Sequence, residues 1–351
     1  MNLFFPNKVY HQKELLTVAN QLLHQQEQWL KDLAQVIIDW HDDRDFMTAQ
    51  TSGSTGTPKT IKLSKESMKQ SALKTGHYFQ LAKGTHALAA LPYSFIAGKM
   101  MVIRSLVLNW NLNIVPPKSN PLAYVEDELD FVAMTPHQLS TVLQQSKWKL
   151  GLVKKILLGG APVGAALLRN IQYIPAEVYL GYGMTETITH IAVKRINGSH
   201  PSKTFSALEG VQFSQSPEAT LNIIADHLEN KIQTTDVVEL ISDKEFEWVG
   251  RADNVINSGG IKIHPEQIEE KMSAVLNQPY FITSRKSELY GEEVILVIEG
   301  ESADKSQLTA AISVHLSKRE LPKDIIFVHQ FEYTETGKVM RKETFEKTLN
   351  R

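Results

Sequence analysis

A loop of glycine, hydroxyl and lysine side chains lies at residues 51–59, where the sequence reads Thr-Ser-Gly-Ser-Thr-Gly-Thr-Pro-Lys. Gly53 and Gly56 let the backbone approach a ligand closely. Successive backbone N–H groups in such a loop can surround an anion, and Lys59 adds a positive charge. The hydroxyl groups belong to Thr51, Ser52, Ser54, Thr55 and Thr57. This composition predicts a polyphosphate site.

The common nucleotide-binding loop is excluded by spacing, because that motif places Lys directly after its second glycine. Here Thr57 and Pro58 stand between Gly56 and Lys59. A flexible Ser/Gly linker is the structural alternative. Linkers rarely combine Pro and Lys with a strand immediately after them, and Ile61–Leu63 is expected to form a short strand, so the ligand-binding interpretation is favoured.

Further strings follow in a fixed order along the chain, and each combines glycines with a polar or charged residue. They are Gly159-Gly160-Ala161-Pro162, Gly181-Tyr182-Gly183-Met184-Thr185-Glu186-Thr187, Thr234-Thr235-Asp236, Gly250-Arg251-Ala252-Asp253, Ser258-Gly259-Gly260-Ile261-Lys262-Ile263 with Pro265-Glu266-Gln267-Ile268-Glu269, and Thr336-Gly337-Lys338-Val339-Met340-Arg341-Lys342. Taken singly, most have an ordinary structural explanation: a strand-to-helix turn, a surface ion pair, or a solvated basic stretch near the C-terminus. Their order favours a shared function.

The loop and the ordered strings resemble the motifs of the acyl-adenylate-forming superfamily, which contains acyl-CoA synthetases, adenylation domains and luciferases. The resemblance covers almost the whole chain from Thr51 onward. It implies that ATP, Mg²⁺ and a carboxylic acid bind in a large domain. A small mobile C-terminal domain then changes place, and coenzyme A or another thiol accepts the acyl group.

The resemblance also implies roles for individual residues. The loop at 51–59 would bind the ATP phosphates, Thr185 the α-phosphate and Glu186 the Mg²⁺. A carboxylate beside phosphate oxygens fits this role, because a divalent cation between them removes the repulsion. Adenine and ribose would contact Gly160, Ala161, Pro162, Tyr182, Asp236 and Arg251. The family usually has glycine where this chain has Thr235, which puts the local backbone conformation in question.

The remaining implied roles belong to the second half of the reaction and to the domain movement. Asp253 would be the hinge, and Gly259 and Gly260 would line the channel for the pantetheine of coenzyme A. Lys338 would be the lysine that assists adenylation. Pro265 suits the first turn of a helix after the glycine pair.

The elements that must position these residues alternate along the chain. Short apolar, strand-like runs at 87–91, 112–116, 131–135, 155–158 and 177–181 are separated mostly by helical stretches, which predicts an α/β sheet flanked by helices. A helix is expected over residues 11–41. Residues 1–252 are expected to form the large domain, with a small β-rich lobe at about 203–250 and a reduced N-terminal subdomain. Residues 253–351 are expected to form a small α+β domain beyond the hinge.

The acid is suggested by a finer resemblance. Typical family members have a much longer region before the phosphate loop, and short chains with these strings resemble 2-succinylbenzoate–CoA ligases of menaquinone biosynthesis. Phe95 and Gly98 align with the acyl-pocket segment of the family. A second carboxylate on the substrate would need a cation, and the candidates near pocket segments are Lys99, Arg104 and His190.

Composition limits the other function classes. The 351 residues include 37 Lys and Arg against 39 Asp and Glu, so nothing indicates a nucleic-acid partner. The absence of cysteine excludes thiol catalysis and cysteine–metal sites. Without a signal peptide or a membrane-length apolar run, we expect a cytoplasmic protein. A homodimer is expected from a shortened large domain. The alternatives are an aryl- or fatty-acid ligase, loading of a carrier protein supplied in trans, and a non-catalytic nucleotide-binding relic.

Overall fold

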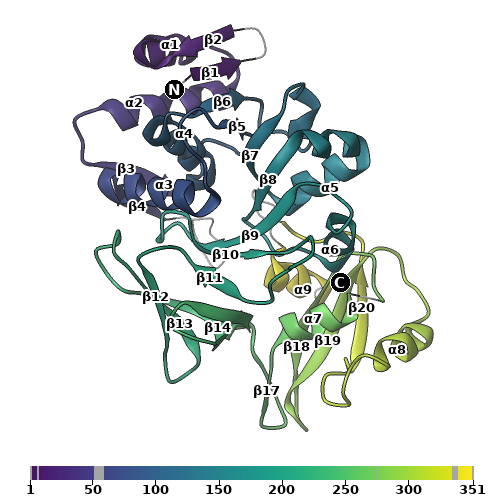
Figure 1. The fold of residues 1–351 in the computed structure, drawn as a ribbon. Helices are drawn as coiled ribbons and strands as arrows, with labels where there is room; N and C mark the ends of the chain where they lie inside the picture. Colours follow the sequence, from purple (N-terminus) through teal and green to yellow (C-terminus); the bar gives the residue numbers. More distant parts are fainter. Residues whose placement is uncertain (1, 6–7, 51–58, 274, 334–338, 350–351) are drawn as a thin grey trace. The chain divides into compact units, whose positions relative to one another are not determined.

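The computed structural model describes residues 2–5, 8–50, 59–273, 275–333 and 339–349, and Figure 1 shows their arrangement. The chain divides into two compact units. The first contains residues 1–162, 170–212 and 223–232, and the second contains residues 163–169, 213–222 and 233–351. Each unit is described by itself, and the expected domain boundary at the hinge stays a prediction.

A large sheet forms the centre of the first unit. Its strands lie in the order β11 (Phe205–Ala207), β10 (His190–Arg195), β9 (Glu177–Gly183), β8 (Val153–Leu158), β7 (Leu129–Met134), β5 (His86–Ala89), β6 (Asn111–Ile114), β1 (Asn2–Phe5) and β2 (Lys8–His11). The neighbours from β9 to β1 are parallel, whereas β11, β10 and β2 run antiparallel to the strand beside them. The five predicted strand-like runs at 87–91, 112–116, 131–135, 155–158 and 177–181 correspond to strands of this sheet. The expected α/β fold is therefore confirmed.

Helices connect and cover these strands. They are α1 (Leu15–Leu22), α2 (Gln28–His41), α3 (Lys65–Phe79), α4 (Ile96–Leu108) and α5 (Pro136–Gln145), and the first four pack against one another in pairs. The ends of the helices follow local rules. Ser64 caps α3 by accepting a hydrogen bond from the Ser67 N–H, and Thr135 and Gln138 form a capping box ahead of α5. A two-stranded hairpin, β3 (Phe46–Gln50) with β4 (Thr60–Ser64), precedes α3.

The expected helix over residues 11–41 is wrong in its extent. The chain instead forms the end of β2, a 3-10 turn at Gln12–Glu14, and the separate helices α1 and α2. The break between the helices at residues 23–27 contains neither Gly nor Pro, so no local signal marks it. The two helices pack against each other, which buries Leu15, Val18 and Leu22 on α1 and Leu33 and Ile37 on α2. Tertiary packing has overridden helix continuity here.

The second unit contains a sheet of five strands: β16 (Ile256–Ser258), β17 (Ile261–Ile263), β18 (Tyr280–Ser287), β19 (Gly291–Glu299) and β20 (Asp324–Val328). Strand β19 alternates between two cores, because Val294, Leu296 and Ile298 join one cluster while Ile295 and Val297 join another. The helices are α7 (Pro265–Met272), α8 (Lys305–Ser313) and α9 (Arg341–Leu349). This pattern is the α+β architecture expected near the C-terminus.

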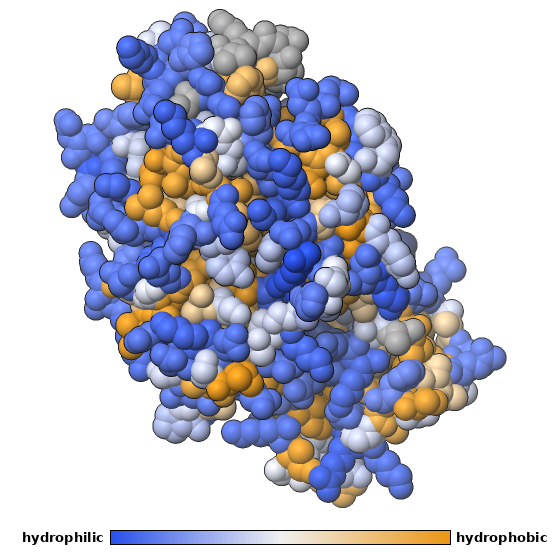
Figure 2. All heavy atoms as spheres, in the orientation of Figure 1, coloured by the Kyte–Doolittle hydropathy of each residue, from blue (hydrophilic) through white to orange (hydrophobic). Residues whose placement is uncertain are grey.

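In the sequence, four strands lie between β11 and β16, and each is hydrogen-bonded to the next. They are β12 (Val211–Gln215), β13 (Thr220–Ala225), β14 (Ile232–Leu240) and β15 (Glu245–Arg251). They correspond to the expected β-rich segment. The short helix α6 (Ala165–Ile171) follows β8. On the face in Figure 2, hydrophilic side chains predominate and hydrophobic ones appear in separate groups. None of the described helices is long and apolar enough to cross a membrane.

Candidate active site

Several predicted site residues follow the carboxyl ends of parallel strands in the first unit. Phe95 lies in the segment after β5 and precedes α4, Gly160 follows β8, and Thr185 and Glu186 follow β9. These strands are parallel, so their carboxyl ends meet at one edge of the sheet. In α/β sheets ligands bind outside that edge. The fold therefore brings chemistry from distant parts of the sequence to one place.

The strand order also reverses at this edge. The chain passes from β5 outward to β6 and then returns to β7 on the other side of β5, before continuing to β8 and β9. Such a reversal opens a crevice between the loops of the two central strands. The segment after β5 contains Phe95, and the residue after β7 is Thr135, whose methyl carbon lies 4.0 Å from the position of a Cβ built on Gly160. The predicted acyl and adenine segments therefore flank this reversal.

A tight turn after β9 holds Thr185 and Glu186. The Thr187 hydroxyl accepts a hydrogen bond from the Met184 N–H at 2.8 Å and lies 2.8 Å from the Thr189 carbonyl oxygen. The Ile188 N–H donates to the Thr185 carbonyl at 2.9 Å, and Ile188 has a φ of 67°. This conformation is strained for a β-branched residue, and such strain is typical of functional sites. The turn leaves Thr185 half-buried and Glu186 exposed.

Glu186 fits a magnesium site of one particular kind. Among the residues that the structure describes, no three His, Asp or Glu side chains form a group that could enclose a metal ion. Mg²⁺ commonly binds through one or two carboxylates together with water and substrate phosphates, so a single exposed carboxylate is sufficient. Glu186 would hold the ion, and the ion would neutralise phosphate charge.

Glycine is required at two predicted positions for different reasons. A Cβ built on Gly98 would lie 2.2 Å from the carbonyl oxygen of Pro92, so the first turn of α4 packs directly on the backbone of the preceding loop. Gly160 has a φ of 84°, which glycine adopts without strain. Beside Gly160, Ala161 is half-buried and Pro162 is exposed. Tyr182 is half-buried in β9, with its ring centroid 5.6 Å from that of Phe205.

A buried arginine packs beneath the turn after β9. Arg104 on α4 is 1% exposed, and its Nη2 donates to the Thr189 hydroxyl at 3.0 Å while its Nε donates to the Thr75 hydroxyl at 3.2 Å. Nη2 also lies 3.5 Å from Nδ1 of the buried His190. Within the described ranges, no carboxylate forms an ion pair with Arg104, so its charge is balanced only by neutral groups. Such a site can receive an anion.

The charge states of this cluster follow from burial. Burial lowers the pKa of Arg104 to about 9, which still leaves the guanidinium charged at neutral pH. Burial, and then the charge of Arg104, lower the pKa of His190 well below its usual value, so His190 is neutral. Lys99, the third predicted cation, instead donates to the Thr48 carbonyl at 2.8 Å. Burial lowers the pKa of Lys99, and Asp39 and Asp32 oppose that shift.

His190 should make stability depend on pH. In the unfolded chain it takes up a proton below about pH 6.5, whereas the folded protein keeps it neutral, so the free energy of unfolding should fall as pH falls. The contribution is at most about 1.4 kcal/mol for each pH unit below that value. Denaturant unfolding at pH 7 and pH 5 measures it. His190→Gln should reduce the difference between the two pH values, while a change at the exposed His200 should not; equal differences in both variants would contradict this assignment.

The predicted ribose-binding residues lie in the second unit. Asp236 on β14 pairs with Arg251 on β15 in the strand register, and the Trp248 Nε1 donates to Asp236 Oδ1 at 3.1 Å. Asp236 is 8% exposed, so this hydrogen bond orients a largely buried carboxylate. Thr235, which replaces the usual glycine, lies in the regular strand β14 without a positive φ. Extended backbone accepts threonine, so this departure leaves the strand intact.

The predicted hinge and thiol-channel residues also belong to the second unit. Arg251 Nη2 donates to Asp253 Oδ2 at 2.6 Å. Burial lowers the pKa of Arg251 and raises that of Asp253, but their ion pair outweighs burial and shifts both in the opposite direction. Gly259 and Gly260 have φ angles of 57° and 78° and form the two-residue turn between β16 and β17. A type I′ hairpin requires these angles, and glycine supplies them.

Two predicted elements lie outside the described residues: the loop residues Thr51, Ser52, Gly53, Ser54, Thr55, Gly56 and Thr57, and Lys338. The flanks of the loop are described. Gln50 at the end of β3 pairs with Thr60 at the start of β4, so the predicted phosphate loop is the connection of a hairpin. The exposed Lys59 directly precedes β4, which confirms the strand expected after the loop.

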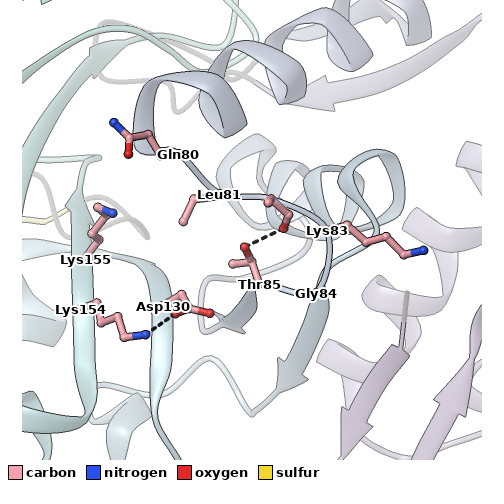
Figure 3. A pocket seen from close by; sticks show the side chains of 9 residues that line it. Gln80, Leu81, Lys83, Gly84, Thr85, Asp130, Lys154 and Lys155 are labelled. Carbon is pink, nitrogen blue, oxygen red and sulfur yellow. Dashed lines mark hydrogen bonds and ion pairs between the residues drawn. The ribbon is translucent and has the colours of Figure 1, made fainter.

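A polar cavity of about 440 Å³ lies away from this edge. It is lined by Gln80, Leu81, Ala82, Lys83, Gly84, Thr85, Asp130, Lys154 and Lys155, which precede or begin β5, β7 and β8 (Figure 3). Amino ends of parallel strands lie opposite their carboxyl ends, so this cavity does not include the predicted site. Lys154 is already paired with Asp130 at 2.8 Å.

Comparison with known proteins bears on the family. The sequence model described as AMP-binding enzyme matches residues 9–213, which is more than half of the chain. The chain belongs to the AMP-binding enzyme family. The matched range includes the loop at 51–59, Arg104 and the turn with Thr185 and Glu186, whereas Asp236 and later residues lie beyond it.

Relatives within this family include short and long chains. An acyl-CoA synthetase (AMP-forming)/AMP-acid ligase II-like protein from Dyadobacter fermentans is 36% identical, with a TM-score of 0.63, over 94% of this chain and 97% of that one. A 2-succinylbenzoate–CoA ligase from Staphylococcus aureus is 24% identical over 84% of this chain. This chain spans 65% of the length of that curated relative.

The fold is also that of a ligand-bound solved structure. O-succinylbenzoate coenzyme A synthetase from Bacillus subtilis, in complex with ATP and magnesium ion, superposes with a TM-score of 0.72 at 18% identity. The match covers 85% of this chain and 69% of that one. At this identity the similarity shows the fold of the AMP-binding family alone.

Some residues of interest had no role in the sequence-based interpretation. Thr75 and Thr189 bind Arg104, Trp248 binds Asp236, and Glu269 binds Arg341 across 72 residues of sequence. Trp248 could have been predicted from the sequence. If β14 and β15 are taken as a hairpin, the alternation of side chains along the two strands places Trp248 near Asp236. The threonines carry no sequence signal, because only the fold places them beside a buried charge.

Proposed function

We propose that this protein is an AMP-forming carboxylate–CoA ligase. A carboxylate oxygen of the substrate attacks the α-phosphorus of ATP, an O–P bond forms, and pyrophosphate leaves. The resulting acyl-adenylate is a mixed anhydride, so the thiol of coenzyme A can displace AMP. The observation that supports this most is the strained turn with Thr185 and Glu186 at the carboxyl edge of the sheet in a member of the AMP-binding enzyme family.

The chain's own residues would act mainly by positioning and by balancing charge. Thr185 would bind the α-phosphate, and the exposed Glu186 would hold Mg²⁺ beside it. Asp236 and Arg251 would bind the ribose, Tyr182 would stack on adenine, and Lys338 would approach the reacting phosphate. Preorganised charges of this kind usually provide the largest part of catalysis in such transfers.

We further propose that the acid is a dicarboxylate, 2-succinylbenzoate, which would place the protein in menaquinone biosynthesis. The curated relatives with that name support this, as does the buried charge of Arg104. A buried charge without an ionic partner costs stability, and a substrate carboxylate would supply the missing partner. His190 stays neutral beside Arg104 and would not compete for that carboxylate.

Replacing Arg104 should separate substrates by charge. Arg104→Gln is expected to raise the KM for 2-succinylbenzoate about ten- to a hundredfold, because a hydrogen bond to a charged group contributes about 1.5–3 kcal/mol. The KM for ATP and the activity with benzoate should change little. Steady-state AMP release with each acid measures this, with Lys154→Gln as a lysine control far from the site. Equal losses with both acids would mean that Arg104 only supports the fold.

The same kinds of assay test two alternative functions. An aryl- or fatty-acid ligase, using coenzyme A or a carrier protein supplied in trans, would release AMP with a monocarboxylate but not with 2-succinylbenzoate. A nucleotide-binding relic would bind ATP without acid-dependent pyrophosphate exchange. A panel of acids tested with ATP, Mg²⁺ and coenzyme A therefore distinguishes all three. A cytoplasmic location and a homodimer complete the proposal, and fractionation and sedimentation test them.

A further inference from the structure

Trp248 lies on the same face of the hairpin of β14 and β15 as Asp236, and an irregularity in the strand pairing places it there. The register pairs here are Asp236 with Arg251, Val237 with Gly250, and Val238 with Trp248. Val249 is therefore an extra residue of β15. Side chains alternate between the two faces of a strand, so a regular register would pair Trp248 with Glu239 and turn it to the opposite face. A β-bulge re-aims a side chain in this way, commonly beside a functional site.

The indole of Trp248 holds the carboxylate of Asp236 in one orientation. Its Nε1 donates to Asp236 Oδ1 at 3.1 Å, and Asp236 is 8% exposed. The main chain is fixed as well, because the Asp236 N–H donates to the Thr234 hydroxyl at 3.1 Å. A carboxylate this deeply buried depends on hydrogen-bond donors. An indole N–H is such a donor and carries no charge, so it directs the carboxylate without neutralising it.

Arg251, the cross-strand partner of Asp236, is directed to another carboxylate. Its Nη2 donates to Asp253 Oδ2 at 2.6 Å. The hydrogen bond from Trp248 is thus the contact that sets the direction of Oδ1 on Asp236. A carboxylate has about four acceptor directions, and the indole takes one of them. A directed and ionised carboxylate is what the recognition of two neighbouring hydroxyl groups requires.

We propose that Trp248 is a positioning residue for nucleotide recognition: its indole aims the Asp236 carboxylate at the ribose hydroxyl groups of ATP. This inference rests on the proposed function for the ribose-binding role of Asp236. The alternative is that Trp248 only stabilises the hairpin of β14 and β15. The two differ in whether loss of the indole N–H still matters when the nucleotide has no ribose hydroxyl groups.

The experiment compares two nucleotides and needs no turnover. Binding of ATP and of 2′,3′-dideoxy-ATP to the full chain, each with Mg²⁺, is measured by isothermal titration calorimetry. Trp248→Phe keeps an aromatic ring and removes the N–H. It should weaken ATP binding about tenfold, because a misdirected carboxylate loses strong hydrogen bonds to the hydroxyls, and should change dideoxy-ATP binding by no more than about twofold. Trp148→Phe, at a side chain that is 69% exposed, is the matched control and should leave both affinities unchanged.

A double-mutant cycle tests whether Trp248 acts through Asp236. In an Asp236→Ala background, Trp248→Phe should have no further effect on ATP binding, because the carboxylate it directs is gone. An equal loss of affinity for both nucleotides, an unchanged ATP affinity, or an additive loss in the double variant overturns the proposal. Trp248→Leu repeats the comparison if circular dichroism shows that the phenylalanine variant does not fold.

The parent protein separates this inference from the proposed function. A parent that binds ATP and dideoxy-ATP equally well would overturn the inference, whatever its activity. A parent that prefers ATP through Trp248 but shows no acid-dependent ATP–pyrophosphate exchange would refute the proposed ligase and leave the role of Trp248 in place.

Discussion

Lys338→Ala is expected to lower acid-dependent ATP–pyrophosphate exchange about a hundred- to a thousandfold, because one charged contact to a developing transition state contributes about 3–4 kcal/mol. Thioester formation from chemically prepared acyl-adenylate should stay close to the parent rate. The reason is that Lys338 would leave the site when the small domain turns about Asp253. Each half-reaction is measured separately with the same enzyme preparation.

The control for the Lys338→Ala prediction is a substitution at Lys342, four residues further along the chain. Lys342 is 81% exposed and lies 3.9 Å from the side chain of Glu346, so Lys342→Ala should retain both half-reactions. A structural defect in Lys338→Ala would lower both half-reactions together, and that result would contradict the assignment of Lys338 to adenylation. Loss of thioester formation alone would reverse the assignment.

The second large effect on acid-dependent exchange is expected from Glu186→Gln. Removing the carboxylate that would hold Mg²⁺ should reduce exchange about a hundredfold and should raise the Mg²⁺ concentration needed for half-maximal rate. Glutamine keeps the size of the side chain, and Glu186 is exposed, so the fold should be unaffected. Exchange rates over a Mg²⁺ titration provide the measurement.

Glu177→Gln is the matched control, because Glu177 begins the same strand, β9, at its amino end and pairs with Arg195 at 3.2 Å. It should behave as the parent does. If Glu186→Gln lost activity without any change in Mg²⁺ dependence, Glu186 would have a role other than metal binding. If it kept full activity, the turn after β9 would not be the catalytic turn.

The centre of the fold was predictable because its signals are local. Strands β5, β7 and β8 each end in a buried apolar run, Ala87–Ala89, Phe131–Met134 and Ile156–Leu158, as is typical of parallel strands inside a sheet. The glycine pair at 259–260 was singled out in the sequence as part of a predicted thiol channel, and the structure uses it as the two-residue turn of a hairpin, which requires positive φ angles. Where one residue type satisfies one local requirement, the sequence is sufficient.

The first sixty residues show the opposite case. Strand β1 is formed by pairing with β6, more than a hundred residues away, and the break between α1 and α2 has no helix-breaking residue. Beyond those sixty residues, α3 and α4 end at Gln80 and Asn109 with φ angles of 54° and 56°, which these residue types permit but do not signal. These features depend on tertiary contacts, and propensity is too weak to indicate them.

The candidate site likewise contains some residues that the sequence identifies and others that only the fold brings together. The motif residues were placed from the sequence at 185–186, 236 and 251, and the structure puts the first pair on a strained turn at the carboxyl edge of the sheet. Arg104 and His190 were separate candidates, and only the fold shows that they lie 3.5 Å apart without a carboxylate partner in the described chain. Because 86 residues separate Arg104 from His190 in the sequence, no local pattern predicts that they are neighbours.

The most direct test of the adenylation chemistry follows one oxygen atom. The acid is labelled with ¹⁸O in the carboxylate and incubated with ATP, Mg²⁺, coenzyme A and the protein, and the products are analysed by mass spectrometry. Attack on the α-phosphorus predicts one ¹⁸O atom in AMP and none in pyrophosphate. Label in inorganic phosphate, or thioester formed without labelled AMP, would contradict the proposed reaction.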